Sequence, residues 1–211
     1  MNTLLKCVLF GLVLSVTGCA TQNRQQLTKD EWKTVTRHTF PGVTKDQATI
    51  AAERVLQLAD GDDFAIVRDQ DGLTAARNWS IYFVLGFVMG TDYWNVRVKQ
   101  DDLGAHVSFA VGSQAQPSQI RAPARHPLDE RPTVMGTMPE GTAIYDLFWS
   151  RMAYLLGQRD TWMSCAESDE RVKAGKAWGM NEALCNSFNV KDETPEGPMV
   201  SVQDATRTSA R

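Results

Sequence analysis

The sequence holds few of the residues on which catalytic and metal sites are built. Only three histidines and four cysteines occur among its 211 residues. His38, His106 and His126 stand far apart, in none of the short spacings that metal-binding histidines share. Gly-x-Ser-x-Gly, P-loop and Gly-x-Gly-x-x-Gly patterns are also missing. We therefore assign no catalytic residue, metal ligand or cofactor, although catalytic groups that meet only in space escape such a search.

Two further absences limit the class of protein. The chain has no basic excess: 22 Lys and Arg face 25 Asp and Glu, and the net charge is −3. Nothing in this balance attracts nucleic acid, so we expect no nucleic-acid partner. No apolar run reaches the roughly 20 residues that a membrane-spanning helix needs. The length allows one domain with a substantial core, with or without a tail.

The most specific pattern lies at the N-terminus. Lys6 precedes an apolar segment of ten residues, Cys7 to Val16. This segment is too short to span a bilayer and is typical of the central part of a cleavable signal peptide. It ends in Val16-Thr17-Gly18-Cys19.

These four residues resemble the lipobox of bacterial lipoproteins, with Val16 at the position that Leu fills most often. The resemblance implies a signal peptide of residues 1–18, cleaved before a lipid-carrying Cys19. Ala20 and Thr21 follow Cys19 where an Asp would favour the inner membrane, which implies the outer membrane, facing the periplasm. The membrane is then one partner, reached through the N-terminal lipid. The alternatives are an uncleaved anchor helix and a secretory signal with an incidental cysteine.

On this interpretation two cysteines remain in the exported chain. Cys7 leaves with the signal peptide and Cys19 carries lipid, so Cys165 and Cys185 form an even pair in an oxidising compartment. We predict a disulfide between them, which should stabilise the fold by roughly 3 kcal/mol. A redox or metal-binding pair is the alternative, although neither cysteine lies in a Cys-x-x-Cys motif.

Periodicity predicts the main elements of one domain, residues 32–188, between a tether over 19–31 and a disordered tail over 189–211. The expected helices begin at Thr44, with the capping box Thr44–Gln47, and at Thr142, with a stop at Gly157. The expected strands are Glu31–Phe40, Phe64–Arg68, Leu73–Trp79, Tyr93–Lys99, His106–Val111 and Thr133–Met138.

The expected fold class is therefore α+β. An antiparallel sheet of about four to six strands should be packed on one face by the two main helices, with a disulfide-stapled segment after them. The order of helix and then hairpin over residues 32–80 is similar to small periplasmic modules of many proteobacterial lipoproteins. That similarity transfers no functional residue. The Pro-rich stretch 112–131 is expected to be a long loop.

The most apolar run after the signal lies between the two hairpins, from Ser80 to Gly90. It has no period, so two interpretations stay open. One is a buried strand or connecting segment under the sheet. The other is a surface that touches lipid or a partner protein. The residues of this possible contact surface are Ile81, Tyr82, Phe83, Leu85 and Phe87.

Three functional hypotheses follow. The first is a non-enzymatic lipoprotein with a structural or accessory role, which binds another envelope protein through Ile81–Met89 or through the Pro-rich loop. The second is a carrier of a small apolar or lipidic ligand held between sheet and helices, near Trp94, Phe109 and Trp149. The third is an envelope hydrolase without a linear motif, which requires a nucleophile, a base and an orienting group in one cleft.

The lipid anchor can be tested directly. Labelled palmitate is expected to enter the unaltered chain and not Cys19→Ala, because the Cys19 sulfur carries the lipid. Cys7→Ala is the matched control and should keep the label, since Cys7 lies inside the signal peptide. Incorporation of label into Cys19→Ala would contradict the lipobox interpretation.

Overall fold

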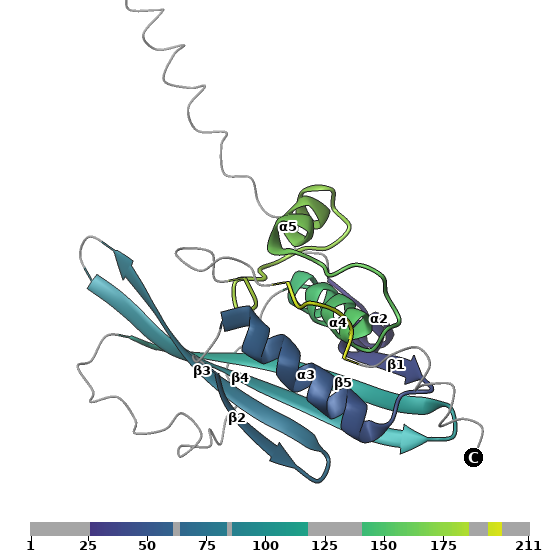
Figure 1. Ribbon diagram of the computed structural model, residues 1–211. Helices are drawn as coiled ribbons and strands as arrows, with labels where there is room; N and C mark the ends of the chain where they lie inside the picture. The colour runs from purple at the N-terminus through teal and green to yellow at the C-terminus, as the bar shows by residue number, and fades with distance from the viewer. Residues whose placement is uncertain (1–25, 61–63, 84–85, 118–140, 186–193, 200–211) are drawn as a thin grey trace, which may run out of the picture.

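Five antiparallel strands form one sheet, and helices cover one of its faces (Figure 1). The computed structural model describes residues 26–60, 64–83, 86–117, 141–185 and 194–199. The spatial order of the strands is β1-β5-β4-β3-β2, so the last four form a meander and β1 joins its far edge. The strands are β1 (Arg37–Pro41), β2 (Phe64–Asp69), β3 (Gly72–Phe83), β4 (Gly86–Asp101) and β5 (Gly104–Pro117). The predicted α+β class is confirmed.

The described residues include four helices. They are α2 (Lys29–Thr36), α3 (Lys45–Asp60), α4 (Ala143–Leu155) and α5 (Cys165–Lys173). Helices α3 and α4 lie on the sheet, and α5 packs on α4 on the side away from it (Figure 1). None of the helices in these ranges is long and apolar enough to cross a membrane.

Both main helices begin and end as their sequences predict. The Thr44 amide donates to Gln47 Oε1 at 2.9 Å, and the Gln47 amide donates to Thr44 Oγ1 at 3.3 Å, which completes the capping box of α3. Gly157 follows α4 with a φ of 69°, the left-handed conformation that glycine adopts most easily. Helix α4 is buried on nearly all sides, because it lies between the sheet, α2 and α5.

The core is a layer of aromatic rings between the middle of the sheet and α4. Phe109 of β5 stacks on Phe148 of α4, with ring centroids 4.1 Å apart, and on Trp94 of β4 at 5.0 Å. All three side chains are at most 1% exposed. Alternation places Trp94, Val96 and Val98 on this face, as a half-buried antiparallel strand requires.

The N-terminal boundary differs from the prediction. Glu31–Phe40 was expected to be a strand, but residues up to Thr36 form α2 and only Arg37 onward is extended. Thr28 and Glu31 form a second capping box, in which each accepts a hydrogen bond from the other's backbone amide. The hydroxyls of Thr34 and Thr36 bond back to carbonyls four residues earlier, so these β-branched residues are accommodated in the helix.

The strands of the meander are longer than predicted. β3 and β4 pair without a break from Gly72↔Arg97 to Phe83↔Gly86, so the apolar run between the two predicted hairpins is the far end of one hairpin. Residues 112–117, expected to open a long loop, continue β5 against β4. The remainder of that predicted loop and the predicted strand Thr133–Met138 lie outside the described residues.

Part of the predicted tail lies against the domain. The Met199 amide donates to the Leu155 carbonyl at 2.8 Å, and Tyr154 Oη donates to the Pro195 carbonyl at 3.5 Å. Residues 194–199 therefore have a defined position at the C-terminal end of α4, where unpaired helical carbonyls accept such bonds. Residues 189–193 and 200–211 of that tail lie outside the described residues.

The aromatic layer gives a test of the fold. Phe109→Ala is expected to lower the free energy of unfolding by roughly 3–5 kcal/mol, because it leaves a cavity between two stacked rings. Urea denaturation measures the change. Val67→Ala is the control: Val67 lies on the edge strand β2 and is 48% exposed, so its loss should matter little. Equal effects of the two substitutions would contradict the placement of the core.

Candidate functional site

The predicted contact residues lie in the β3–β4 hairpin. Ile81, Tyr82 and Phe83 end β3, and Phe87 is the second residue of β4. The backbone pairs are Ile81↔Val88, Tyr82↔Phe87 and Phe83↔Gly86. Leu85 lies outside the described residues, as does Cys19. The paired ends of β3 and β4 project past the C-terminal end of α3, beyond the helices that cover the rest of the sheet (Figure 1).

A buried charge cluster lies at the base of this projection. Arg77 follows Leu73 and Ala75 on the face of β3 that meets the helices, and Asp92 precedes Trp94 on the same face of β4. The two residues are a direct cross-strand pair, 7% and 8% exposed, with Arg77 Nη2 at 3.8 Å from Asp92 Oδ2. The Arg77 guanidinium also lies over the ring of Phe64, 5.7 Å from its centroid.

Trp79 closes the cluster toward the hairpin end. Its indole nitrogen donates to Asp92 Oδ1 at 3.0 Å. Its ring lies directly on Gly90, where an added Cβ would stand 2.2 Å from a Trp79 ring carbon. Any side chain at position 90 would therefore displace the indole from Asp92. Gly90 is required here for close approach, because nothing larger fits beneath the ring.

The carboxyl of Asp92 has an unusual environment. Burial raises its pKa above the ordinary value, and hydrogen bonding from Ser113, the charge of Arg77 and the Trp79 bond offset this only in part. Sequence reasoning missed the cluster, although a signal was present. Arg77 and Asp92 occupy positions where the alternation of their strands predicts an inward-facing apolar residue.

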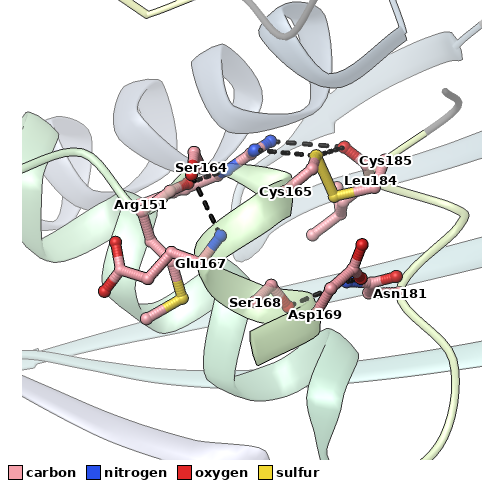
Figure 2. The surroundings of a disulfide bond; sticks show 10 residues. Arg151, Ser164, Cys165, Glu167, Ser168, Asp169, Asn181, Leu184 and Cys185 are labelled. Atoms are coloured by element: carbon pink, nitrogen blue, oxygen red, sulfur yellow. Dashed lines mark hydrogen bonds between the residues drawn. A yellow bond between two sulfur atoms is a disulfide. The ribbon is translucent and has the colours of Figure 1, made fainter. Parts of the chain in front are cut away.

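The disulfide predicted between Cys165 and Cys185 is present, with Cα atoms 5.6 Å apart. It joins the first residue of α5 to the segment that follows residue 178 (Figure 2). Arg151 of α4 lies beside it and is fully buried. The Arg151 guanidinium donates to the carbonyls of Met163 and Leu184 at 3.1 Å and 3.3 Å, so it ties both cysteine-bearing segments to α4.

Three side chains on the surface, an acid, an imidazole and a hydroxyl, are joined by hydrogen bonds. His106 Nε2 is 2.5 Å from Asp101 Oδ2, and its Nδ1 is 2.9 Å from Thr39 Oγ1. The order of groups is that of a hydrolase triad. However, all three side chains are well exposed, and neither of the two grooves described below is lined by any of them.

Asp101 also has a structural role, because it holds the turn in which it lies. Its Oδ1 accepts the amides of Leu103 and Gly104 at 2.8 Å and 3.2 Å in the β4–β5 turn. The Leu103 bond is the main reason that the pKa of Asp101 is lowered, and the hydrogen bond and charge of His106 add to it. We conclude that His106 fastens this turn to β1 through Thr39, and we assign no catalysis to it.

Two grooves occur in the described part of the molecule. One, of about 330 Å³, lies between α2, α4 and residues 175–178. Tyr145 and Trp178 line it, but the Tyr145 Oη and Trp178 Nε1 atoms are closed off from solvent, so a ligand in the groove cannot reach them. Burial raises the pKa of Tyr145 to about 12. The other, of about 390 Å³, lies between α3, the end of α4 and residues 194–199.

Packed aromatic rings occupy the space between sheet and helices where the carrier hypothesis places a ligand. Trp94 and Phe109 are in ring contact with Phe148, and neither lines a described groove. Of the expected lining residues only Trp149 borders a groove, and its indole nitrogen donates to the Val35 carbonyl at 2.8 Å.

Metal-ligand residues do not gather in the described part of the chain. Within it, no three His, Cys, Asp or Glu side chains come together as metal ligands would. His38 stacks on Trp149 with ring centroids 5.7 Å apart, and burial lowers its pKa, which keeps the imidazole neutral. His126 lies outside the described residues.

No protein-family model, no curated protein and no solved structure matches the chain. Its function is therefore argued from its own residues.

The buried pair at the hairpin base should contribute to stability. Asp92→Ala is expected to lower the free energy of unfolding by about 3 kcal/mol, because it removes one partner of a buried guanidinium and the acceptor of the Trp79 bond. Chemical denaturation at neutral pH measures the loss. Glu170→Ala is the matched control: its pair with Lys173 is exposed, and its removal should change little. A loss for Asp92→Ala no larger than for Glu170→Ala would contradict the described contacts.

Proposed function

We propose that the chain is a lipid-anchored protein of the bacterial outer membrane, facing the periplasm, whose domain binds another envelope component through the end of the β3–β4 hairpin. The binding residues are Ile81, Tyr82, Phe83, Leu85 and Phe87. The role is structural or accessory, and we assign no enzymatic reaction.

The observation that carries the proposal is the position of the apolar run. Residues 80–83 and 86–90 of the run occupy paired strand ends that project beyond the helices that cover the rest of that face (Figure 1). At its C-terminal end Met89 is 40% exposed. An apolar segment on a projecting element is typical of a surface that a partner covers.

The charge cluster supports the same assignment. Binding surfaces are effective when they are held on rigid elements, because less conformational freedom is lost on binding. Asp92 bonds to Trp79 and pairs with Arg77 at the point where the hairpin leaves the helical layer. The cluster thereby fixes the direction in which the hairpin end projects.

The anchor supports a location close to the bilayer. Eight residues lead from Cys19 to Leu27, which borders the groove beside α2. Eight residues span at most about 28 Å when fully extended. A lipid on Cys19 would therefore keep the domain within that distance of the membrane, where its partner would be membrane-bound or periplasmic.

Site-specific photocrosslinking in cells tests the contact surface. A photoreactive phenylalanine analogue at Tyr82 or Phe87 is expected to capture the same envelope component, because both positions lie in the projecting hairpin. The same analogue at Val67 is the control, since that exposed residue lies on the edge strand away from the hairpin end. Phe87→Asp should abolish capture at position 82. Capture at Val67 alone, or at none of the three positions, would contradict the proposal.

A further inference from the structure

The surroundings of the Cys165–Cys185 bridge favour negative charge on one of its sulfurs. Arg151 Nη2 donates to Cys165 Sγ at 3.4 Å (Figure 2). The guanidinium is fully buried and lies over the ring of Trp162, 4.6 Å from its centroid. In such a poorly solvated position a positive charge acts more strongly on its neighbours than it would in water.

The backbone adds to this effect. Cys165 is the first residue of α5, and Ser164 caps the helix by accepting the Glu167 amide at 3.1 Å. The N-terminal end of a helix carries partial positive charge from its unpaired amides. A neighbouring arginine and a helix N-terminus each stabilise a cysteine thiolate.

Three acidic groups of α4 and α5 have hydrogen-bond partners other than Arg151. Glu167 accepts a hydrogen bond from Arg159 at 2.9 Å, and Asp169 accepts one from Asn181 at 3.1 Å. Asp146 of α4 is held by Arg171 of α5 in a two-point ion pair at 2.6 Å and 2.9 Å. The charges of Glu167 and Asp146 are therefore compensated by arginines, whereas Asp169 has only the neutral amide of Asn181.

The two sulfur-bearing residues differ in exposure. Cys185 is 7% exposed, whereas Cys165 is half-buried. Of the two cysteines, Cys165 is therefore the more exposed to a thiol in solvent. The residue that is easier to reach is also the one whose thiolate the protein stabilises.

We propose that the Cys165–Cys185 bridge is a thiol–disulfide exchange site, in which Cys165 is the sulfur that an external dithiol attacks. This inference goes beyond the proposed hairpin contact and does not depend on it.

The exchange proceeds in two displacements. A thiolate of the dithiol donates its electron pair to Cys165 Sγ, the bridge breaks, and Cys185 leaves as a thiolate that takes up a proton. The second thiolate of the dithiol then attacks the first sulfur of the dithiol, which is bonded to Cys165 in the mixed disulfide. Cys165 leaves as a thiolate beside Arg151. The dithiol is oxidised to a disulfide, and the protein gains two electrons. The reverse sequence closes the bridge.

Alkylation of single thiols tests the charge on Cys165. In the chain with Cys7→Ser, Cys19→Ser and Cys185→Ala, the rate of reaction with iodoacetamide is followed against pH. The midpoint is expected at least one pH unit below about 8.5, the value of a free cysteine. Arg151→Met should move it most of the way back to about 8.5, because only the helix N-terminus then remains, whereas Arg151→Lys should keep most of the lowering. A midpoint at or above about 8.5 in the chain with Arg151 intact overturns the proposal.

Two measurements on the intact bridge complete the test. In dithiothreitol buffers, Arg151→Met should make the bridge about ten-fold harder to reduce, which is the equivalent of one pH unit in thiolate stability. With glutathione as a monothiol, peptide mass spectrometry should find the mixed disulfide on Cys165. Trapping on Cys185, or reduction that is unchanged in a folded Arg151→Met, overturns the proposal. If Arg151→Met does not fold, two measurements on chains that keep Arg151 still test the proposal. They are the cysteine that glutathione traps and the pH midpoint of Cys165 alkylation.

Discussion

The stacking of Phe109 on Phe148 is the contact on which the layers of the molecule depend. It joins the middle of the sheet to the middle of α4, and Trp94 extends it to the neighbouring strand. Because α4 is held there, α5 and the disulfide-bearing segment have a fixed helix on which to pack. Buried aromatic rings occupy the interior at this level, and the two proposed sites lie on elements that leave it.

Two such elements stand out, and both are positioned by a buried arginine. Arg77 lies where β3 and β4 pass beyond the helices, opposite Asp92. Arg151 lies where α4 meets the bridge, bonded to carbonyls and to a sulfur. A buried guanidinium is costly unless its surroundings compensate it, so each arginine constrains how the neighbouring segments are arranged. The proposed contact surface and the proposed exchange site are the segments so constrained.

Local patterns in the sequence predicted where the elements lie more accurately than how long they are. The Thr44 capping box and the alternation through Trp94 and Phe109 gave correct positions, because the physical cause lies within a few residues. The Thr28 capping box was overlooked, since Thr34 and Thr36 favour strands until their hydroxyls find helical carbonyls. The disulfide followed from counting cysteines. The approach of Arg151 to Cys165 and of Arg77 to Asp92 depends on tertiary packing and strand register, which no local pattern encodes.

The position of β1 has a consequence for the order of folding. Among the described strands β1 comes first in the chain, yet the strand it pairs with is β5, which comes last; Thr39 bonds to His106 across 67 positions. Adjacent strands of the meander can pair through short turns, whereas this pairing must close a long loop and is slow for that reason. We therefore expect the pairing of β1 with β5 to form last, after the four-stranded meander has formed as its template.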